Sequence, residues 1–154
     1  MVRYHPYPQI LDQIPRDKNA VIEASAGTGK TFTLEHLIVD RVLAGVPLER
    51  ILVVTFTEKA TAELRRRVRA KLIEVRTSTR DEEEGPSWPI DEEAKGRLSL
   101  AERRFPSAAI STIHSFCQRA LSEHAFLSRR LFKETVVDGR RVFHEAWRYV
   151  VRHE

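Results

Sequence analysis

Cysteine and long apolar runs are the two features that this sequence most clearly lacks. Cys117 is the single cysteine among 154 residues, which excludes a disulfide framework and favours a reducing compartment such as the cytoplasm. No segment approaches the roughly 18 consecutive apolar residues of a membrane span, and no apolar signal-peptide region opens the chain. We therefore expect a cytoplasmic protein with no membrane partner.

The composition suits one globular domain with a core of its own. Hydrophobic residues make up 42% of the chain and charged residues 31%, a balance typical of a soluble protein. The net charge is +4 and the isoelectric point is about 9.5, which gives weak support to a polyanionic partner.

Two closely spaced glycines mark the most informative segment, residues 23–31 (EASAGTGKT). A buried strand is expected before it, at Asn19–Ile22. A helix is expected after it, because apolar residues recur on one face: Leu34, Leu37, Ile38 and Val42. Gly45 as a C-cap and Pro47 beyond it indicate where this helix ends.

A strand, a glycine-bearing turn and a helix in succession are the context of a phosphate-binding loop. Gly27 and Gly29 let the backbone curl so that N–H groups face an anion, and the helix N-terminus adds a partial positive charge. Lys30 would reach the β- and γ-phosphates of a nucleotide, and the Thr31 hydroxyl would help to hold Mg²⁺. The alternative is a glycine turn with an exposed lysine.

The next apolar segment, Ile51–Val54, is expected to be a buried strand, so that strand, helix and strand form a βαβ unit and predict a parallel sheet. It leads into Thr55, Phe56 and Thr57. An aromatic side chain at a strand end can stack on a base of single-stranded DNA, and neighbouring hydroxyl groups can bind phosphates. For Phe56 the alternative is a core aromatic.

Thr57 is expected to cap a second helix. The inward positions of this helix are predicted from their spacing: Leu64, Val68, Leu72 and Val75. The outer face is strongly basic, with Arg65, Arg66, Arg67, Arg69, Lys71 and Arg76. Such a face is either solvated or extends a track for nucleic acid, and the sequence does not decide between the two.

Residues 77–97 are rich in acidic residues, proline and glycine, and are expected to form a mobile surface loop away from any DNA. Trp88 within this segment is either an anchor or a partly exposed aromatic. A short helix is expected near Arg97–Arg103.

A third strand is expected at Ala108–Ser111, and it leads to a second polar turn with Thr112, His114 and Ser115. Small polar groups and free backbone amides at a strand-to-helix turn can hold a phosphate. No second histidine or cysteine lies at metal-ligand spacing from His114, so a metal site is not expected there.

Phe116 and Cys117 fall on the apolar face of the helix that follows this turn, and both are expected in the core. A buried thiol is a poor nucleophile, which argues against catalysis by Cys117.

Together and in this order, the three segments resemble motifs of superfamily 1 DNA helicases of the UvrD/Rep type. The loop from Ala24 to Thr31 carries the alanine that these helicases have in place of the usual first glycine, residues 55–64 resemble motif Ia, and residues 112–119 resemble motif Ic. The resemblance covers most of residues 9–134. The first and third segments are most similar to the RecB-like branch, the exodeoxyribonuclease V beta subunits.

The resemblance implies an α/β fold, a P-loop NTPase (RecA-like) parallel sheet flanked by helices, present here as an incomplete first motor domain. Residues 1–124 would form the partial ATP-binding domain, with the acidic loop at about 77–97. Residues 125–154 would begin an inserted helical subdomain, whose last helix would expose Phe143 and Trp147.

The resemblance also implies residue roles. Gln9 would recognise the adenine edge, with Gln13 as a competing candidate. Lys30 and Thr31 would be the catalytic residues, and Thr31 would be the metal ligand. Contacts to ATP would come from Gln9, Ala24, Ser25, Ala26, Gly27, Thr28, Gly29, Lys30, Thr31 and Phe32. Contacts to single-stranded DNA would come from Thr55, Phe56, Thr57, Thr112, His114 and Ser115.

The function so implied is that of the ATP-binding N-terminal portion of a DNA helicase or exonuclease subunit that unwinds DNA in double-strand break repair. Its cofactors would be ATP and Mg²⁺. Its partners would be single-stranded DNA, the remainder of the helicase chain and other subunits of an exodeoxyribonuclease V-like complex.

The chain departs from the family pattern in what it lacks. By the family pattern, the chain is expected to stop before the Asp-Glu motif that completes Mg²⁺ binding, before the second RecA-like domain and before any nuclease domain. The chain alone is therefore not expected to be a competent ATPase. Two other functions remain open from the residues themselves: a P-loop small-molecule kinase and a non-catalytic P-loop interaction module.

Overall fold

The computed structural model describes most of the chain as far as residue 123 and a few residues beyond it. The described residues are 2–23, 25, 27, 29–81, 85–123, 139–140, 143–144 and 147–149. They divide into two compact units, Met1–Phe116 and Cys117–Glu154. The first unit holds the segments that the sequence singled out.

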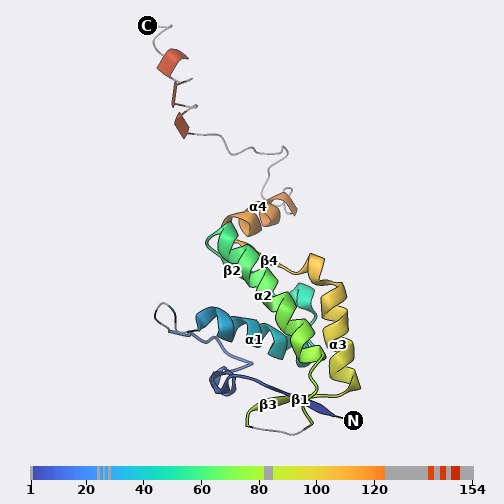
Figure 1. Ribbon diagram of the computed structural model, residues 1–154. Helices are drawn as coiled ribbons and strands as arrows, with labels where there is room; N and C mark the ends of the chain where they lie inside the picture. The colour runs from blue at the N-terminus through green and yellow to red at the C-terminus, as the bar shows by residue number, and fades with distance from the viewer. Residues whose placement is uncertain are drawn as a thin grey trace. The chain divides into compact units, whose positions relative to one another are not determined.

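Three helices form most of the core of the first unit: α1 (Lys30–Leu43), α2 (Glu58–Arg76) and α3 (Glu92–Arg103). Helix α2 packs against both α1 and α3 (Figure 1). Apolar residues of all three helices are buried between them, among them Ile38, Val39, Val42, Leu64, Val68, Leu72, Val75 and Leu98. The inward faces predicted for α1 and α2 are confirmed, with Leu34 and Leu37 packed at the edge of the core.

The predicted end of α1 is also confirmed. Gly45 follows the helix with a φ of +90°, in the left-handed region that glycine adopts most readily. The amide of Gly45 donates to the Val42 carbonyl at 2.9 Å, and the amide of Val46 donates to the Arg41 carbonyl at 3.0 Å. This pair of hydrogen bonds satisfies carbonyls that the helix end would otherwise leave without donors.

The strands form two separate pairs. Strand β2 (Val53–Thr55) runs parallel to β4 (Ile110–Thr112), and β1 (Arg3–Pro6) runs antiparallel to β3 (Ser87–Ile90). Short 3₁₀ turns at Gln9–Gln13 (η1), Leu48–Arg50 (η2) and Phe105–Ser107 (η3) connect the elements. The prediction of a mixed α/β fold with a parallel pair of strands is therefore confirmed.

The strand predicted at Asn19–Ile22 is absent, and this prediction was wrong. Residues 19–23 have no regular structure, and the side chain of Val21 is 86% exposed. An apolar run becomes a strand only where another strand accepts its hydrogen bonds. Among the described residues, β2 and β4 pair only with each other.

The strand predicted at Ile51–Val54 is present but shifted and covered on one face only. Strand β2 begins at Val53, which is buried, whereas Leu52 and Val54 are about half exposed. Because successive side chains of a strand point to opposite faces, the alternation shows that helices cover one side of this pair.

The prediction of a mobile acidic loop at residues 77–97 was wrong for most of the segment. Residues 87–90 form β3, and α3 begins at Glu92 rather than near Arg97. Asp91 caps α3, since its carboxylate accepts a hydrogen bond from the Ala94 amide at 2.8 Å. Asp91, Glu92 and Glu93 thus lie at a helix start, where negative charge is stabilising, whereas residues 82–84 lie outside the described part.

Trp88 is the anchor that the sequence allowed for. Its side chain is buried, with its ring centroid 5.1 Å from that of Tyr7 and 6.0 Å from that of His36. Its indole nitrogen donates to the Asp40 carboxylate at 3.3 Å.

Two further predictions concern α4 (Ile113–Glu123) and the residues after it. No residue of α4 is buried and Cys117 is exposed, so the prediction of Phe116 and Cys117 as core residues was wrong. The two residues share one face of the helix, as their spacing predicted. Burial also requires another element that packs against this face, and periodicity does not predict such an element. Phe143 and Trp147 are exposed as predicted, with ring centroids 6.4 Å apart, and most of residues 124–154 lie outside the described part.

Candidate nucleotide site and strand-end turns

The loop before α1 has the backbone conformation expected of a phosphate-binding loop. Gly27 has a φ of +81° and Gly29 a φ of +88°, both in the left-handed region. An added Cβ at Gly27 would meet no atom within 4 Å, so the backbone conformation, not crowding, favours glycine there. The loop residues Ala24, Ala26 and Thr28 lie outside the described part of the chain.

Lys30 and Thr31 open α1 and are exposed. Gly29 is the N-cap of the helix, and its carbonyl accepts from the Thr33 amide at 2.8 Å. The Lys30 ammonium group donates to the Ser25 carbonyl at 2.9 Å, which holds the side chain over the loop. The Lys30 side chain and the first turn of α1 thus lie on one exposed surface, and a helix N-terminus favours an anion.

Both candidate adenine-recognition residues lie in the 3₁₀ turn η1, which packs against α1. Gln9 opens the turn and Gln13 ends it, and both side chains are exposed. Leu11 between them is buried and holds the turn in place. Exposure does not favour one glutamine over the other, so the assignment of Gln9 stays a prediction.

Behind the loop lies a residue that the sequence did not single out, His36. It is 2% exposed, its Nδ1 lies 2.7 Å from the Phe32 carbonyl oxygen, and its ring centroid is 4.2 Å from that of Phe32. Burial lowers the pKa of His36, because a charged imidazolium would lose its hydration. The sequence contained one signal for this contact: His36 follows Phe32 by four residues, and side chains at this spacing are neighbours on a helix.

The two polar turns lie side by side, as predicted. In the parallel pair, Thr55 at the end of β2 is the register partner of Thr112 at the end of β4. Both turns start a helix with a threonine cap. Thr57 accepts from the Ala60 amide at 3.1 Å, and Thr112 accepts from the Ser115 amide at 3.2 Å. The cap predicted at Thr57 is confirmed.

Phe56 is 88% exposed at the first turn, which excludes the alternative of a core aromatic. His114 and Ser115 are exposed at the second turn. Thr55 and Thr112 are less accessible: the Thr55 hydroxyl lies 2.6 Å from that of Thr61, and Thr112 is buried. Four of the six predicted DNA-contact residues are thus exposed, namely Phe56, Thr57, His114 and Ser115, and their contact with DNA stays a prediction.

Glu58, in the first turn of α2, joins the two turns and was missed by the sequence analysis. The Thr112 hydroxyl donates to its carboxylate at 3.1 Å, and the Ser115 hydroxyl lies 3.4 Å from the same oxygen. In the sequence, an acidic residue in the first turn of a capped helix predicts that it stabilises the helix. It does not predict the contact of Glu58 with Thr112, 54 residues away.

An ion pair joins α1, which begins at the glycine loop, to α2, which begins at Glu58 shortly after Phe56. Arg67 of α2 donates from Nε to the Glu35 carboxylate of α1 at 2.7 Å. Glu35 is 4% exposed.

Within the described residues, no group of three histidine, cysteine, aspartate or glutamate side chains is placed to hold a metal ion. None of the helices that the structure describes is long and apolar enough to cross a membrane.

A mixed α/β fold, with a G-x-G-K-T loop at a helix N-terminus and a parallel pair of strands, is consistent with the P-loop NTPase class. Residues 10–145 match the family model of the UvrD/REP helicase N-terminal domain. The chain belongs to this family, as its resemblance to UvrD/Rep-type helicases predicted.

Curated relatives are helicase–nuclease subunits. The chain is 43% identical over 144 residues to the RecBCD enzyme subunit RecB of Escherichia coli strain K12, which covers 82% of this chain and 12% of the relative. It is 39% identical over 138 residues to RecB of Haemophilus influenzae, and the match covers 75% of this chain and 11% of the relative. It is 38% identical over 102 residues to the exonuclease/helicase subunit RexA of Lactococcus lactis, and the match covers 66% of this chain and 8% of the relative. The chain therefore spans about a tenth of the length of these relatives.

Proposed function

We propose that this chain is the nucleotide-binding N-terminal portion of a DNA helicase or helicase–nuclease subunit that acts on DNA double-strand breaks. The observation that carries the proposal is the loop before α1, with Gly27 and Gly29 in left-handed conformations and Lys30 at the helix start, in a chain of this family. The family match favours this function over the kinase and interaction-module alternatives.

The loop fits the triphosphate of ATP. Its exposed backbone amides and the Lys30 ammonium group would bind phosphate oxygens, and the Thr31 hydroxyl would contribute to holding Mg²⁺. Mg-ATP supplies the phosphoanhydride bond whose hydrolysis drives helicases. A phosphate would be a stronger acceptor for the Lys30 ammonium group than the Ser25 carbonyl, because the phosphate is charged.

The two strand-end turns fit single-stranded DNA. Phe56 offers an exposed ring for base stacking, and His114 and Ser115 offer polar groups for a phosphate beside it. Glu58 disfavours a phosphate at its own position, so the strand would cross the Phe56 side of the paired turns.

We further propose that the chain alone binds nucleotide without working as a motor. The Asp-Glu pair that follows a strand, Asp91-Glu92, comes after β3, which pairs with β1 and not with the parallel strands, and Asp91 caps α3. This pair therefore does not supply the acidic group that completes Mg²⁺ binding in helicase motors. The partners of the chain would be the remainder of a helicase chain and subunits like those of the RecBCD enzyme, in the cytoplasm.

Titration of Mg-ADP and Mg-ATP into the chain tests the nucleotide site. Lys30→Ala should weaken binding by about 10- to 150-fold, since a charge-assisted hydrogen bond contributes about 1.5–3 kcal/mol. Lys95→Ala is the matched control, because Lys95 forms only a surface ion pair with Glu92 on α3 and should leave the affinity unchanged.

Equal affinities of the wild type and Lys30→Ala would reject the loop as the nucleotide site. Steady ATP hydrolysis by the chain faster than about 1 s⁻¹, abolished by Lys30→Ala, would reject the proposal that the chain is not a motor by itself.

A further inference from the structure

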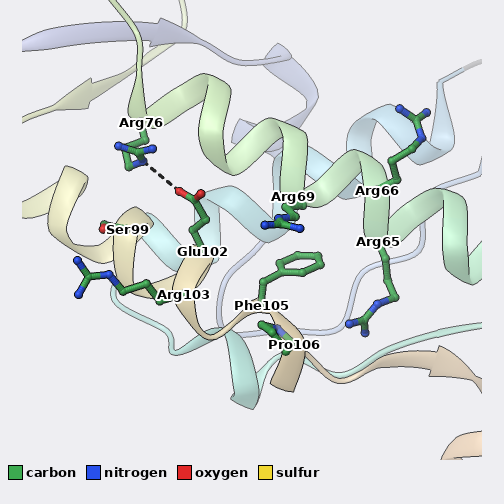
Figure 2. A pocket seen from close by; sticks show the side chains of 9 residues that line it. All are labelled: Arg65, Arg66, Arg69, Arg76, Ser99, Glu102, Arg103, Phe105 and Pro106. Carbon is green, nitrogen blue, oxygen red and sulfur yellow. Dashed lines mark ion pairs between the residues drawn. The ribbon is translucent and has the colours of Figure 1, made fainter.

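A basic pocket lies on the side of α2 that faces α3 and η3, and the proposed function does not use it. The pocket has a volume of about 770 Å³. Its lining includes five arginines and one glutamate: Arg65, Arg66, Arg69, Arg76, Arg103 and Glu102. Figure 2 shows Arg65 and Arg69 reaching from α2 toward Phe105, whereas Arg66 points away.

Only part of this positive charge is neutralised. Arg76 lies 3.2 Å from the Glu102 carboxylate, and Arg66 pairs with Glu63 at 2.8 Å. Arg65, Arg69 and Arg103 form no ion pair with any carboxylate that the structure describes. Three uncompensated arginines around one pocket repel one another, so binding of an anion would lower the free energy of this surface.

Arginines elsewhere in the described chain are partly neutralised as well. Five of them pair with a carboxylate: Arg3 with Asp81, Arg16 with Asp40, Arg67 with Glu35, Arg97 with Glu93, and Arg104 with Glu49. Others outside the pocket, among them Arg41, Arg50, Arg80 and Arg119, form no ion pair with a carboxylate that the structure describes. The pocket is distinguished because three such arginines line one surface.

The guanidinium group of Arg65 is fixed in position by two carbonyl groups and an aromatic ring. One of its guanidinium nitrogens donates to the carbonyls of Ala108 at 3.1 Å and Ile110 at 3.3 Å, and the guanidinium lies 5.4 Å from the centre of the buried Phe105 ring. Carbonyl groups leave the full positive charge in place. A planar guanidinium fixed in this way presents its remaining N–H groups to a phosphate with little loss of entropy.

We propose that this pocket binds the sugar–phosphate backbone of DNA, as a second DNA contact separate from the strand-end turns. The proposal rests on the proposed function, which makes DNA the polyanion that this chain meets. Along α2, Arg65 to Arg69 spans about 6 Å and Arg65 to Arg76 about 16 Å. One strand of duplex DNA carries a phosphate every ~3.4 Å of axis, so this row faces several phosphates at once.

The pocket recognises backbone and not bases. Phe105, the aromatic residue in its lining, is buried and offers no exposed face for stacking. Binding here should therefore be independent of sequence and should extend to duplex DNA, in contrast to a contact through the exposed ring of Phe56.

The test measures the affinity of the chain for a fluorescent 20-base-pair duplex at several salt concentrations. The variant is the double substitution Arg69→Gln with Arg103→Gln, since both side chains are exposed and their loss should not disturb folding. The matched control is Arg50→Gln with Arg104→Gln, which removes the same charge from exposed arginines outside the pocket. Circular dichroism and thermal unfolding confirm that all three proteins are folded.

We expect the pocket variant to bind the duplex about 10-fold more weakly at 100 mM salt, with the slope of log affinity against log salt reduced by about 2. The control should change affinity less than about twofold. Equal losses in the two doubles, or no loss in either, would overturn the proposal. The proposal would also be overturned if the pocket variant lost binding to a polyglutamate peptide but kept its affinity for the duplex. That result would indicate an acidic protein partner.

Failure of the proposed function gives a different result. Mg-ADP affinity depends on Lys30 and not on Arg69 or Arg103, so a nucleotide site that fails leaves the duplex measurement intact. A pocket that fails leaves the effect of Lys30→Ala intact.

Discussion

The two strand pairs of the first unit differ in how they use their apolar side chains. In the antiparallel pair, Trp88 and Ile90 of β3 are buried, and His5 of β1 stacks with Trp88 at a centroid distance of 6.3 Å. In the parallel pair, Val54 is 44% exposed and Phe56 beyond it is 88% exposed. Both pairs contribute to the core, since Val53 and Ile110 of the parallel pair are buried, but the parallel pair leaves its other face and the end of β2 at Phe56 exposed.

This difference indicates which residues contribute mainly to folding stability and which are exposed for ligand binding. A buried aromatic residue contributes several kcal/mol to folding through contacts that leave it unavailable to a ligand. An exposed aromatic residue contributes little to folding and keeps its ring available for binding. Trp88 of the antiparallel pair should therefore contribute much more to the unfolding free energy than Phe56, and Phe56 at the end of the parallel pair should contribute more to ligand binding.

Trp88→Ala should have the largest effect on stability. Removal of this side chain leaves a cavity beside His36 and Tyr7 and a lost hydrogen bond to Asp40, and should lower the free energy of unfolding by about 3–5 kcal/mol. Urea denaturation measures the loss. Phe56→Ala is the control from the other pair and should change the free energy of unfolding by less than about 0.5 kcal/mol.

Similar losses in the two variants would contradict the division between the strand pairs. If Trp88→Ala prevents folding altogether, Trp88→Phe gives a smaller loss that can still be compared with Phe56→Ala.

Phe56→Ala should instead weaken binding of single-stranded DNA, by about 1–3 kcal/mol for one lost base stack. Fluorescence anisotropy with an oligonucleotide at several salt concentrations measures it. The salt slope should stay unchanged, because stacking releases no counterions. Arg66→Ala is the comparison: it should lower the slope if the exposed face of α2 contacts phosphates.

Unchanged DNA affinity in a folded Phe56→Ala protein would remove the stacking contact from the proposed function. The exposed ring would then need another partner.

The smallest effect is a pH dependence that arises in the antiparallel pair and the helix behind it. Burial lowers the pKa of both His5 and His36, so the folded protein holds them neutral while the unfolded chain takes up protons below about pH 6.5. Stability should be complete above that pH and should fall on acidification, by at most about 1.4 kcal/mol per pH unit for each histidine. Urea denaturation at pH 7.5 and 5.5 measures the change.

His36→Asn should reduce the pH dependence even if it lowers stability at both pH values. His114→Asn is the matched control, since His114 is exposed at the second turn, and it should leave the dependence as it is. An equal pH dependence in the wild type and His36→Asn would show that other groups cause it. The other groups around His5 are Glu74, Lys71 and Arg80, and those around His36 include Glu35, Glu74 and Lys71.

The sequence predicted the elements whose signal is local. The stripes of α1 and α2, the Thr57 cap, the Gly45 helix end and the glycine conformations in the loop follow from spacing and from single-residue preferences. The family and its motif segments were likewise recognisable from short runs of residues.

The errors have a common physical cause, which is dependence on a distant partner. The strand at Asn19–Ile22 and the buried face of α4 had the right local pattern but needed a second surface. The pairing of β1 with β3 joins residues more than 80 positions apart and gives no local sign. For the same reason Glu58 and His36 were missed, since their contacts exist only in the folded chain.

The ion pair between Glu35 and Arg67 has a consequence for communication within the molecule. It joins the helix that begins at the glycine loop to the helix that begins beside Phe56. Separation of the two groups would leave a buried carboxylate without its cation, which is costly. If the chain has the proposed function, this ion pair would couple a displacement of α1 at the nucleotide site to α2 and the strand-end turns.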